Sequence, residues 1–332
     1  MKESILTVLM PVYNAGPFLR EAIDSILGQT FQNFEFLIIN DGSTDDSVEI
    51  IKSFDDPRIR LVHNERNLGL IATLNKGLDL VNTRYLARMD ADDISLPQRF
   101  EKQLQAIQAE SNIIACGTAY QKFGAQNHVL SFPESHEEIY CGLLFTPTLA
   151  HAAIMFDMEM VNGEGYRFDP DYAHAEDYEF WTRLGLKYRL ANLPEVLYRY
   201  RMHSSQVSYV HSQAQVDNSL RVQQTMLRRL GFEPSATEMG LHRTFFTREA
   251  IRDFEYLTEV GRWFDKILST NEQGRHFDRT ALLGCLGRIW FSRAYRCSRN
   301  GMKVFRLYRT KRYAKASLKS RVRFFAKCLL KR

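Results

Sequence analysis

The stretch YLARMDADDI, residues 85–94, places three carboxylates directly after an apolar run. The run Tyr85–Ala87 is typical of the end of a buried strand, and Pro97 opens a helical pattern soon afterwards. Three aspartates at a rigid strand end repel one another unless a cation neutralises them. Hard divalent cations such as Mg²⁺ or Mn²⁺ prefer carboxylate oxygens and keep open positions for phosphate oxygens. The stretch therefore predicts a metal site that holds a diphosphate; an acidic turn that caps the next helix is the alternative.

The chain before this stretch alternates buried strands with amphipathic helices. Residues 5–14 and 34–40 are mainly apolar runs, the pattern of strands buried on both faces of a parallel sheet. Each is followed by apolar residues at spacings of three and four, which predict helices, and Ser43 or Thr44 is predicted to cap the second helix. Residues 59–62 predict a short third strand. This alternation with short loops predicts an α/β fold with a parallel sheet and right-handed crossovers.

Polar residues follow three of the predicted strands, at the edge where open α/β sheets bind ligands. Pro11, Tyr13 and Asn14 end the first strand, Asp41 follows the second, and Asp90 follows the fourth. Tyr13 can stack on a ligand or shape its pocket, and Asp41 can accept from the N–H of a base such as uracil. The chain has neither a glycine-rich dinucleotide motif nor a P-loop, so a bound diphosphate requires the metal that the aspartates hold.

Composition places the chain among ordinary globular proteins. Its 332 residues are 45% apolar, which suits one large or two ordinary domains. Its five cysteines lack Cys-x-x-Cys spacing, which argues against a disulfide framework and a zinc site and suits a reducing compartment. We see no signal peptide before the first strand, and no stretch reaches the roughly 20 apolar residues of a membrane span. These features predict a cytoplasmic location.

Charge is divided unevenly along the chain. Residues 279–332 contain 17 basic and no acidic residues, whereas the remainder contains 27 basic and 39 acidic residues. Apolar residues recur at helical spacings within this tail, at Phe305, Tyr308, Val322, Phe325 and Leu329. A helix with an apolar stripe and a basic polar face lies in the membrane interface rather than across it. We therefore predict that residues 300–332 dock on the anionic inner face of the cell membrane. A solvated tail, or one folded onto the acidic body, is the alternative.

Taken together, these motifs resemble those of family-2 glycosyltransferases, inverting enzymes of GT-A fold that use nucleotide sugars. The resemblance covers about residues 4–208. It rests on MPVYN at 10–14, NDGSTD at 40–45, NLGL at 67–70, NKGL at 75–78, RMDADD at 88–93, PQRFEKQ at 97–103, EDYEFW at 176–181 and YRYRMH at 198–203. It implies a GT-A domain over residues 1–211, with a Rossmann-like, mostly parallel sheet flanked by helices. Helical spacings then predict a C-terminal helical appendage over residues 212–332.

The resemblance also implies which residues hold the nucleotide sugar. In the family pattern, the first two strand ends hold the nucleoside, and the fourth holds the diphosphate and the metal. The residues of this chain at those positions are Pro11, Tyr13, Asn14, Asp41, Asp90 and Asp92. Asp92 would bind Mn²⁺ or Mg²⁺, with Asp93 as a supporting carboxylate.

The resemblance also places basic residues near the implied diphosphate. His203 would be either a second metal ligand or a capping or core histidine, and Arg201 would contact a phosphate. Many family members carry arginine where this chain has Leu74. Arg66 or Arg88 would then contact the diphosphate, unless each is a surface cation or pairs with a neighbouring acid.

The resemblance places the general base at the start of a predicted helix. Transfer with inversion requires in-line attack by an acceptor hydroxyl, and a positioned carboxylate must take its proton. The pattern assigns that role to Asp177, with Glu176 orienting the base or binding acceptor. Acidic residues at a helix N-terminus are also favoured electrostatically, without a catalytic role. Trp181 and His151 would be either acceptor contacts or core residues.

The implied function is transfer of a sugar from a nucleotide sugar, of UDP type, to a hydroxyl of a lipid-linked or surface glycan. An aspartyl phosphohydrolase also uses Asp-x-Asp after a strand, but usually after the first one. A basic tail is compatible with nucleic-acid binding, but the acidic body and the lack of a recognised nucleic-acid-binding motif argue against it. The predicted partners are a nucleotide sugar, a glycan or lipid-linked acceptor and an anionic membrane, and no nucleic acid.

Overall fold

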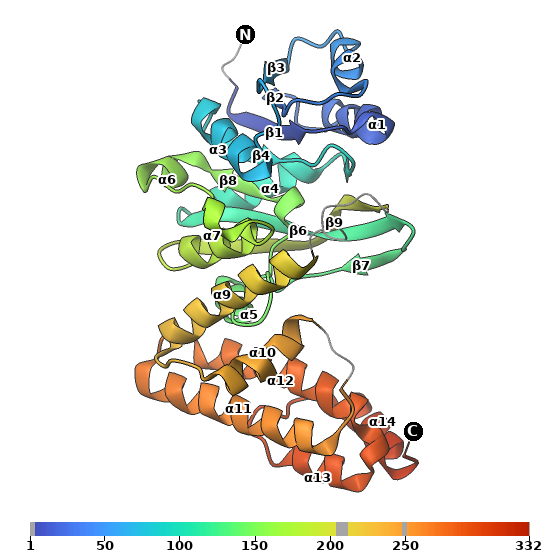
Figure 1. Cartoon of the computed structure of the whole chain (residues 1–332), viewed down its shortest axis with the longest axis vertical. Coiled ribbons are helices and arrows are strands. Elements are labelled where there is room, and N and C mark those ends of the chain that lie inside the picture. Colours follow the sequence, from blue (N-terminus) through green and yellow to red (C-terminus); the bar gives the residue numbers. More distant parts are fainter. Residues whose placement is uncertain (1–3, 204–211, 248–250, 332) are drawn as a thin grey trace. The chain divides into compact units, whose positions relative to one another are not determined.

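The computed structural model describes residues 4–203, 212–247 and 251–331. The chain divides into two compact units, one of residues 1–139 with 147–218 and one of residues 140–146 with 219–332 (Figure 1). The predicted boundary, residue 211, lies outside the described residues. The observed division falls within helix α9 (Ser212–Leu230) and assigns residues 140–146 to the second unit.

The first unit is built on one mixed sheet. Its strands are β1 (Leu6–Val12), β2 (Phe34–Asn40), β3 (Ile59–His63), β4 (Tyr85–Arg88), β5 (Ile94–Ser95), β6 (Ile113–Gly124), β7 (His128–Leu130), β8 (Met155–Asp157) and β9 (Arg189–Met202). Within the described residues the order is β3-β2-β1-β4-β8-β6-β9-β5, with β7 beside β6. The first four strands are parallel, as predicted, and β6 and β9 are parallel to each other, whereas β5, β7 and β8 pair antiparallel.

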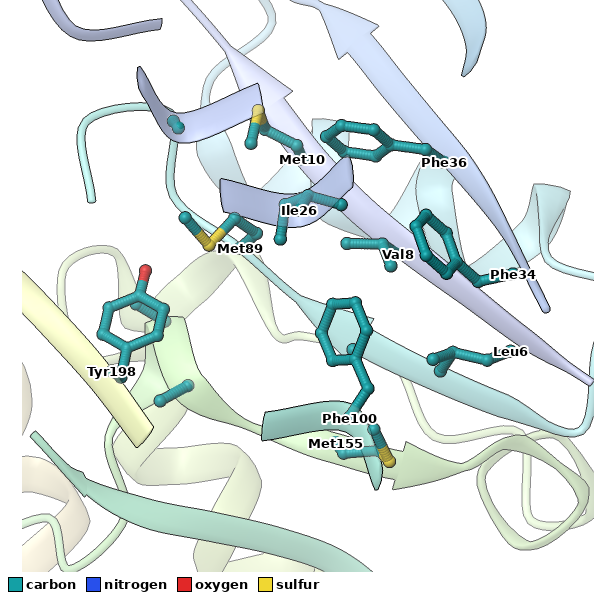
Figure 2. Packing of buried hydrophobic residues seen from close by; sticks show 14 of the residues in the cluster. Leu6, Val8, Met10, Ile26, Phe34, Phe36, Met89, Phe100, Met155 and Tyr198 are labelled. Atoms are coloured by element: carbon teal, nitrogen blue, oxygen red, sulfur yellow. The ribbon is translucent and has the colours of Figure 1, made fainter. Parts of the chain in front are cut away.

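Helices cover both faces of this sheet. They are α1 (Gly16–Leu27), α2 (Ser47–Lys52), α3 (Leu70–Leu80), α4 (Arg99–Ala109), α5 (His136–Gly142), α6 (Met158–Gly163) and α7 (Glu176–Leu184). Alternate residues of β1 pack with Ile26 of α1 and Phe100 of α4 in the main core (Figure 2). On the opposite face α3 comes so close that a Cβ on Gly77 would lie 2.4 Å from Cδ2 of Leu9. The parallel strands are thus covered on both faces, which explains their continuous apolar runs.

Hydrogen bonds join the loop after β1 to the loop after β2. The N–H of Asn14 donates to Oγ of Ser43 at 3.0 Å, and the N–H of Thr44 donates to Oδ1 of Asn14 at 2.8 Å. The prediction that Ser43 or Thr44 caps α2 is therefore wrong, because Asp46 occupies the cap position and makes no side-chain cap bond. Both residues instead hold the loop that carries Asn14, which adopts a left-handed conformation with φ of 50°.

The second unit is helical. Besides the later part of α9 it contains α10 (Ala236–Phe246), α11 (Phe254–Gly274), α12 (Arg279–Arg296), α13 (Met302–Arg309) and α14 (Leu318–Leu329). Residues 140–146 belong to it because Phe145 is part of its core. The Phe145 ring stacks on His242 at 5.0 Å and meets Phe245 and Phe264 edge-on. None of the helices in the described ranges combines the length and the apolar run that crossing a bilayer requires.

Candidate active site

The three carboxylates after β4 gather at one point. Ligand atoms of Asp90, Asp92 and Asp93 lie within 4.8 Å of one another. Pairing of β5 with β9 brings the end of β9 to this cluster. Nε2 of His203 lies 2.8 Å from Oδ2 of Asp92, and Oδ1 of Asp93 accepts from the N–H of Arg201 at 2.7 Å. The predicted metal residues, Asp92 and His203, are therefore neighbours although 111 positions separate them in the sequence.

The cluster has the character of a cation site. Oδ2 of Asp93 is buried and has no hydrogen-bond partner among the described residues. Burial, followed by the charges of Asp92 and Asp90, raises the pKa of Asp93 well above its ordinary value. A divalent cation would relieve this repulsion, and carboxylate oxygens with one imidazole are donors that Mn²⁺ or Mg²⁺ accepts. The residues present therefore fit such an ion.

Arg201 is engaged within the protein. Its Nε donates to the backbone oxygen of Asp92 at 2.7 Å, and its guanidinium pairs with Glu21 and lies over the rings of Phe18 and Phe123. These contacts hold the turn that carries the carboxylates. The guanidinium of Arg201 already has partners on several sides. Its predicted contact with a phosphate stays a prediction.

At the nucleoside end, Asp41 is buried at the carboxyl end of β2. Its carboxylate accepts from Nδ2 of Asn64 at 2.7 Å, and from the N–H groups of Leu68 and Gly69 at 2.9 and 3.0 Å. An ionised carboxylate has about four acceptor positions, so one remains for a ligand. Asp41 therefore fixes the 64–69 loop as well as offering a contact. Pro11 and Tyr13 lie at the end of β1, where Tyr13 is 50% exposed.

The predicted acid pair opens α7. Glu176 is buried, and its Oε2 has no hydrogen-bond partner in the described part of the chain. Asp177 is partly exposed and accepts from the N–H of Tyr178 at 2.7 Å. Burial raises the pKa of Asp177 to about 6, and burial together with the neighbouring Asp177 raises the pKa of Glu176 to about 7. The pKa values of both carboxyls are thus raised toward neutral pH, the range in which general acids and bases work.

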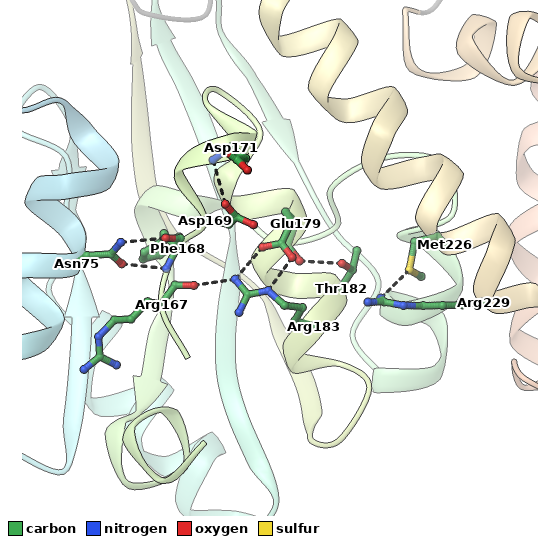
Figure 3. A network of polar contacts seen from close by, with 10 residues as sticks. All are labelled: Asn75, Arg167, Phe168, Asp169, Asp171, Glu179, Thr182, Arg183, Met226 and Arg229. Atoms are coloured by element: carbon green, nitrogen blue, oxygen red, sulfur yellow. Dashed lines mark hydrogen bonds and ion pairs between the residues drawn. The ribbon is translucent and has the colours of Figure 1, made fainter. Parts of the chain in front are cut away.

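The segment that leads into α7 is pinned to α3 (Figure 3). Asn75 of α3 makes two hydrogen bonds to the backbone of Phe168, at 2.8 and 2.9 Å. The guanidinium of Arg183 donates to both carboxylate oxygens of Glu179, at 2.6 and 2.7 Å, and to the backbone oxygen of Arg167 at 2.7 Å. The start of α7 is thereby fixed relative to the strand ends.

Trp181 and His151 have different surroundings. Trp181 is fully buried and packs on Phe156 and Phe180, so it is a core residue and the acceptor-platform alternative is wrong. His151 is mostly buried, with Nδ1 3.9 Å from Oε1 of Glu176. Burial, helped by the charge of Arg88, lowers the pKa of His151 well below its usual value. A neutral imidazole therefore lies against the acid pair.

Two buried arginines organise the site: the sequence analysis named Arg88, with an ion pair as one alternative, and missed Arg99. Nη2 of Arg88 lies 2.7 Å from Oδ1 of Asp90, and the charge of Arg88 also limits how far burial raises the pKa values of Glu176 and Asp177. Of the alternatives predicted for these two arginines, Arg88 pairs with a neighbouring acid, whereas Arg66 is an exposed surface residue. Arg99 donates to the backbone oxygen of Arg88 at 2.7 Å, and burial lowers the pKa of Arg99 to about 10. The available signal was the spacing of Arg88 and Asp90, since residues two apart on an extended chain share a face.

Comparison with known proteins identifies the family. The model of glycosyl transferase family 2 matches residues 7–145. An uncharacterized glycosyltransferase of Haemophilus influenzae is 32% identical over 231 residues, which are 66% of this chain and 72% of the relative. The chain belongs to glycosyl transferase family 2. It is therefore a glycosyltransferase, and the phosphohydrolase alternative is set aside.

Two further glycosyltransferases are similar to this chain. The putative glycosyltransferase EpsE of Bacillus subtilis is 29% identical over 280 residues, 81% of this chain and 96% of the relative. The amylovoran biosynthesis glycosyltransferase AmsE of Erwinia amylovora is 29% identical over 228 residues, 64% of this chain and 84% of the relative.

Solved structures share the fold of this family-2 chain. S. aureus TarS 1–349, solved in complex with UDP-GlcNAc, aligns with a TM-score of 0.59 at 15% identity, over 92% of this chain and 91% of that one. The mannosyltransferase PcManGT of Pyrobaculum calidifontis, solved with GDP-Man and Mn²⁺, aligns with a TM-score of 0.54 at 15% identity, over 98% and 85%. At this identity the likeness establishes the fold, an α/β fold of GT-A type with a C-terminal helical region.

Proposed function

We propose that this family-2 enzyme is an inverting hexosyltransferase that uses a UDP-sugar. Its acceptor is a hydroxyl of a lipid-linked or surface glycan, and its setting is polysaccharide biosynthesis. The observation that carries the proposal is the gathering of Asp90, Asp92 and Asp93 at a strand end that Arg88 links electrostatically to the acid pair of α7. Donor and acceptor chemistry thereby share one buried charge network.

The donor is proposed to lie along the carboxyl ends of β1, β2 and β4. Pro11, Tyr13 and Asn14 border the nucleoside, and the open acceptor position of Asp41 receives an N–H of the base. Support for a nucleotide sugar comes from the fold, since TarS and PcManGT were solved with UDP-GlcNAc and with GDP-Man and Mn²⁺. The single imino N–H of a pyrimidine base such as uracil matches one free carboxylate position better than guanine, which presents an imino N–H beside an amino group.

The metal site is proposed at Asp92 and His203, with Asp90 beside the diphosphate. A bound Mn²⁺ or Mg²⁺ would supply neutralisation of the charge that develops on the leaving diphosphate. Asp93 is placed deeper and holds the backbone of Arg201, so its part is to fix the end of β9. The unpartnered Oδ2 of Asp93 and its raised pKa support a cation at this cluster.

Asp177 is proposed as the general base. It is partly exposed at the start of α7, and the N–H of Tyr178 holds one of its oxygens, so the other can take the proton of an acceptor hydroxyl. Glu176 is buried beside His151 and is suited to orienting the pair rather than to meeting the acceptor. The charge of Arg88 keeps the pKa of Asp177 from rising further, so the base is ionised at neutral pH.

The proposed location is cytoplasmic, on the inner face of the cell membrane, where nucleotide sugars and lipid-linked acceptors meet. The name of AmsE, amylovoran biosynthesis glycosyltransferase, supports the class of process. The basic tail supports the location, because basic residues near an anionic leaflet are attracted to it.

A donor screen tests the proposal. Purified protein is heated with Mn²⁺ and each of a panel of UDP-, GDP- and dTDP-sugars, and slow donor hydrolysis is followed in parallel. A UDP-sugar should raise the melting temperature, EDTA should cancel the effect, and Asp92→Asn should lose both readouts. Asp55→Asn, at an exposed site before β3, is the matched control and should keep them. Equal stabilisation in EDTA would refute the metal role, and stabilisation by GDP- or dTDP-sugars alone would refute the UDP assignment.

A further inference from the structure

Helix α14 has two separate apolar faces. Phe324 and Cys328 are buried, and Phe324 packs against the rings of Phe291, Tyr295, Phe305 and Tyr308. A second row is exposed, although one of its members, Phe325, also meets Phe305 edge-on. Its members and their exposed fractions are Leu318 at 73%, Val322 at 60%, Phe325 at 41% and Leu329 at 60%.

The geometry of the helix explains why one core cannot use both faces. At 3.6 residues per turn, the spacings of four, three and four put the exposed row within an arc of roughly 60°. That arc is centred roughly 110° away from Phe324 and Cys328. Packing against the second unit therefore accounts for Phe324 and Cys328 and for one edge of Phe325, which meets Phe305 at 5.2 Å, but not for Leu318, Val322 or Leu329. We call the row Leu318, Val322, Phe325 and Leu329 the outward face of α14.

The predicted apolar stripe of the tail is thereby divided. Tyr308 is buried, and Phe305 packs on both Phe324 and Phe325, so these two residues stabilise the unit rather than forming a free surface. Val322, Phe325 and Leu329 remain exposed as the prediction requires, and Leu318 joins them. The free surface is one helix of 12 residues, not the whole of residues 300–332.

Basic side chains border the outward face on both sides. Lys319 and Arg323 follow it around the helix in one direction, and Arg321 lies between it and the buried face in the other. All three are exposed, and no carboxylate of the described residues pairs with them. The chain has no acidic residue after Asp278. The face therefore combines apolar area with uncompensated positive charge.

We propose that the outward face of α14 docks on an anionic lipid bilayer. The apolar row would enter the boundary between headgroups and acyl chains, while the flanking lysine and arginine side chains reach the phosphates. Charge complementarity selects this occupant, because a planar anionic surface meets cations on both sides of the row at once. The inference rests on the proposed membrane location but is independent of the proposed transfer reaction.

Vesicle binding by the full-length protein tests the inference. Sedimentation is measured with vesicles of phosphatidylcholine alone and of phosphatidylcholine with phosphatidylglycerol, at low and high salt. The wild type should bind the anionic vesicles at low salt and be released by high salt. Val322→Ser with Phe325→Ser should weaken binding about tenfold or more. Lys319→Glu with Arg323→Glu should weaken it at low salt.

Matched controls keep the result interpretable. Val129→Ser and Leu186→Ser replace apolar residues that are 54% and 57% exposed elsewhere, and they should bind as the wild type does. Unchanged vesicle binding by the Val322/Phe325 variant overturns the inference. Equal binding to neutral and anionic vesicles also overturns it. A third contrary outcome is a wild type that binds no vesicles but forms an oligomer, which the Val322/Phe325 variant dissociates. Thermal stabilisation by UDP-sugars is measured for the wild type and for every variant. If the wild type shows no stabilisation, that result counts against the proposed function and not against docking.

Discussion

The strand-end cluster of the first unit and helix α14 of the second depart from the usual distribution of side chains in opposite ways. In the first, charged groups of Arg88 and Asp93 are buried, whereas in the second, large apolar groups such as Leu318 and Val322 are exposed. Folded chains normally avoid buried charge, and they seldom expose a row of apolar residues. Each departure costs stability, and each lies where the sequence predicts a ligand.

The two regions also differ in how their charge is balanced. Around Arg88 the buried cation faces Asp90 directly and Glu176 and Asp177 through space, so the site contains its own counter-charges. Around α14 no carboxylate of the described residues pairs with Lys319, Arg321 or Arg323, so their counter-charge comes from solvent ions or from the anionic surface that we propose. The comparison teaches that a charged group can be balanced within the protein, as at Arg88, or left for solvent or a partner to balance, as on α14.

The largest effect is expected at the acid pair. Asp177→Asn should reduce turnover by about 10²–10⁴, the usual contribution of a general base, and leave UDP-sugar binding nearly unchanged. Steady-state kinetics with a glycan acceptor, and thermal shifts with donor alone, separate the two readouts. Asp171→Asn, at an exposed position before α7, is the control. Loss of donor binding in Asp177→Asn would place that residue in the donor site and make Glu176 the better candidate.

Neighbouring phenylalanines sharpen the contrast within α14. Phe324→Ala should lower the free energy of unfolding by about 3–5 kcal/mol, because it empties a buried ring position. Phe325→Ala, at a position that is 41% exposed, should cost less than about 1 kcal/mol. Urea denaturation of both variants measures the difference. Equal losses would mean that the outward face is covered by the protein itself.

Removal of the buried cation should weaken the first unit. Arg88→Met breaks an ion pair whose arginine is buried, and we expect a loss of about 3 kcal/mol, the lower end for such pairs because Asp90 is partly exposed. Arg66→Met, at an exposed site, should change stability by no more than about 0.5 kcal/mol. Denaturation midpoints of the two variants decide it, and an unchanged midpoint for Arg88→Met would show that the pair is not needed for folding.

The pH dependence of turnover tests the raised pKa of Asp177 without a mutation. The pKa of Asp177 is raised to about 6, so its ionised, proton-accepting form is lost as pH falls through that value. Turnover should then fall about tenfold per pH unit below about pH 6, and stay level above it until another group titrates. A profile of kcat against pH in the presence of Mn²⁺ measures this. An acid limb near pH 4 would indicate an unperturbed carboxylate as the base.

Much of the fold was readable because it is encoded locally. The continuous apolar runs of β1 and β2 and the 3.6-residue spacings of α1 and α3 report burial directly, and the motifs around Asp41 and Asp90 mark strand ends. The antiparallel insertion of β8 between β4 and β6 was not readable, since a three-residue strand has no period of its own. The strand formed by residues 128–130 was missed for the same reason.

The sequence by itself determined the α/β alternation, the acidic cluster after β4 and the surplus of positive charge after Asp278. Tertiary structure decided among the alternatives that the sequence left open: Arg88 pairs with Asp90, Trp181 is a core residue, and α14 keeps Val322 outside while burying Phe324. Local pattern fixes which residues are apolar and how they repeat. Which of two apolar faces is covered, and which carboxylate meets which cation, depends on segments that meet only after the chain has folded.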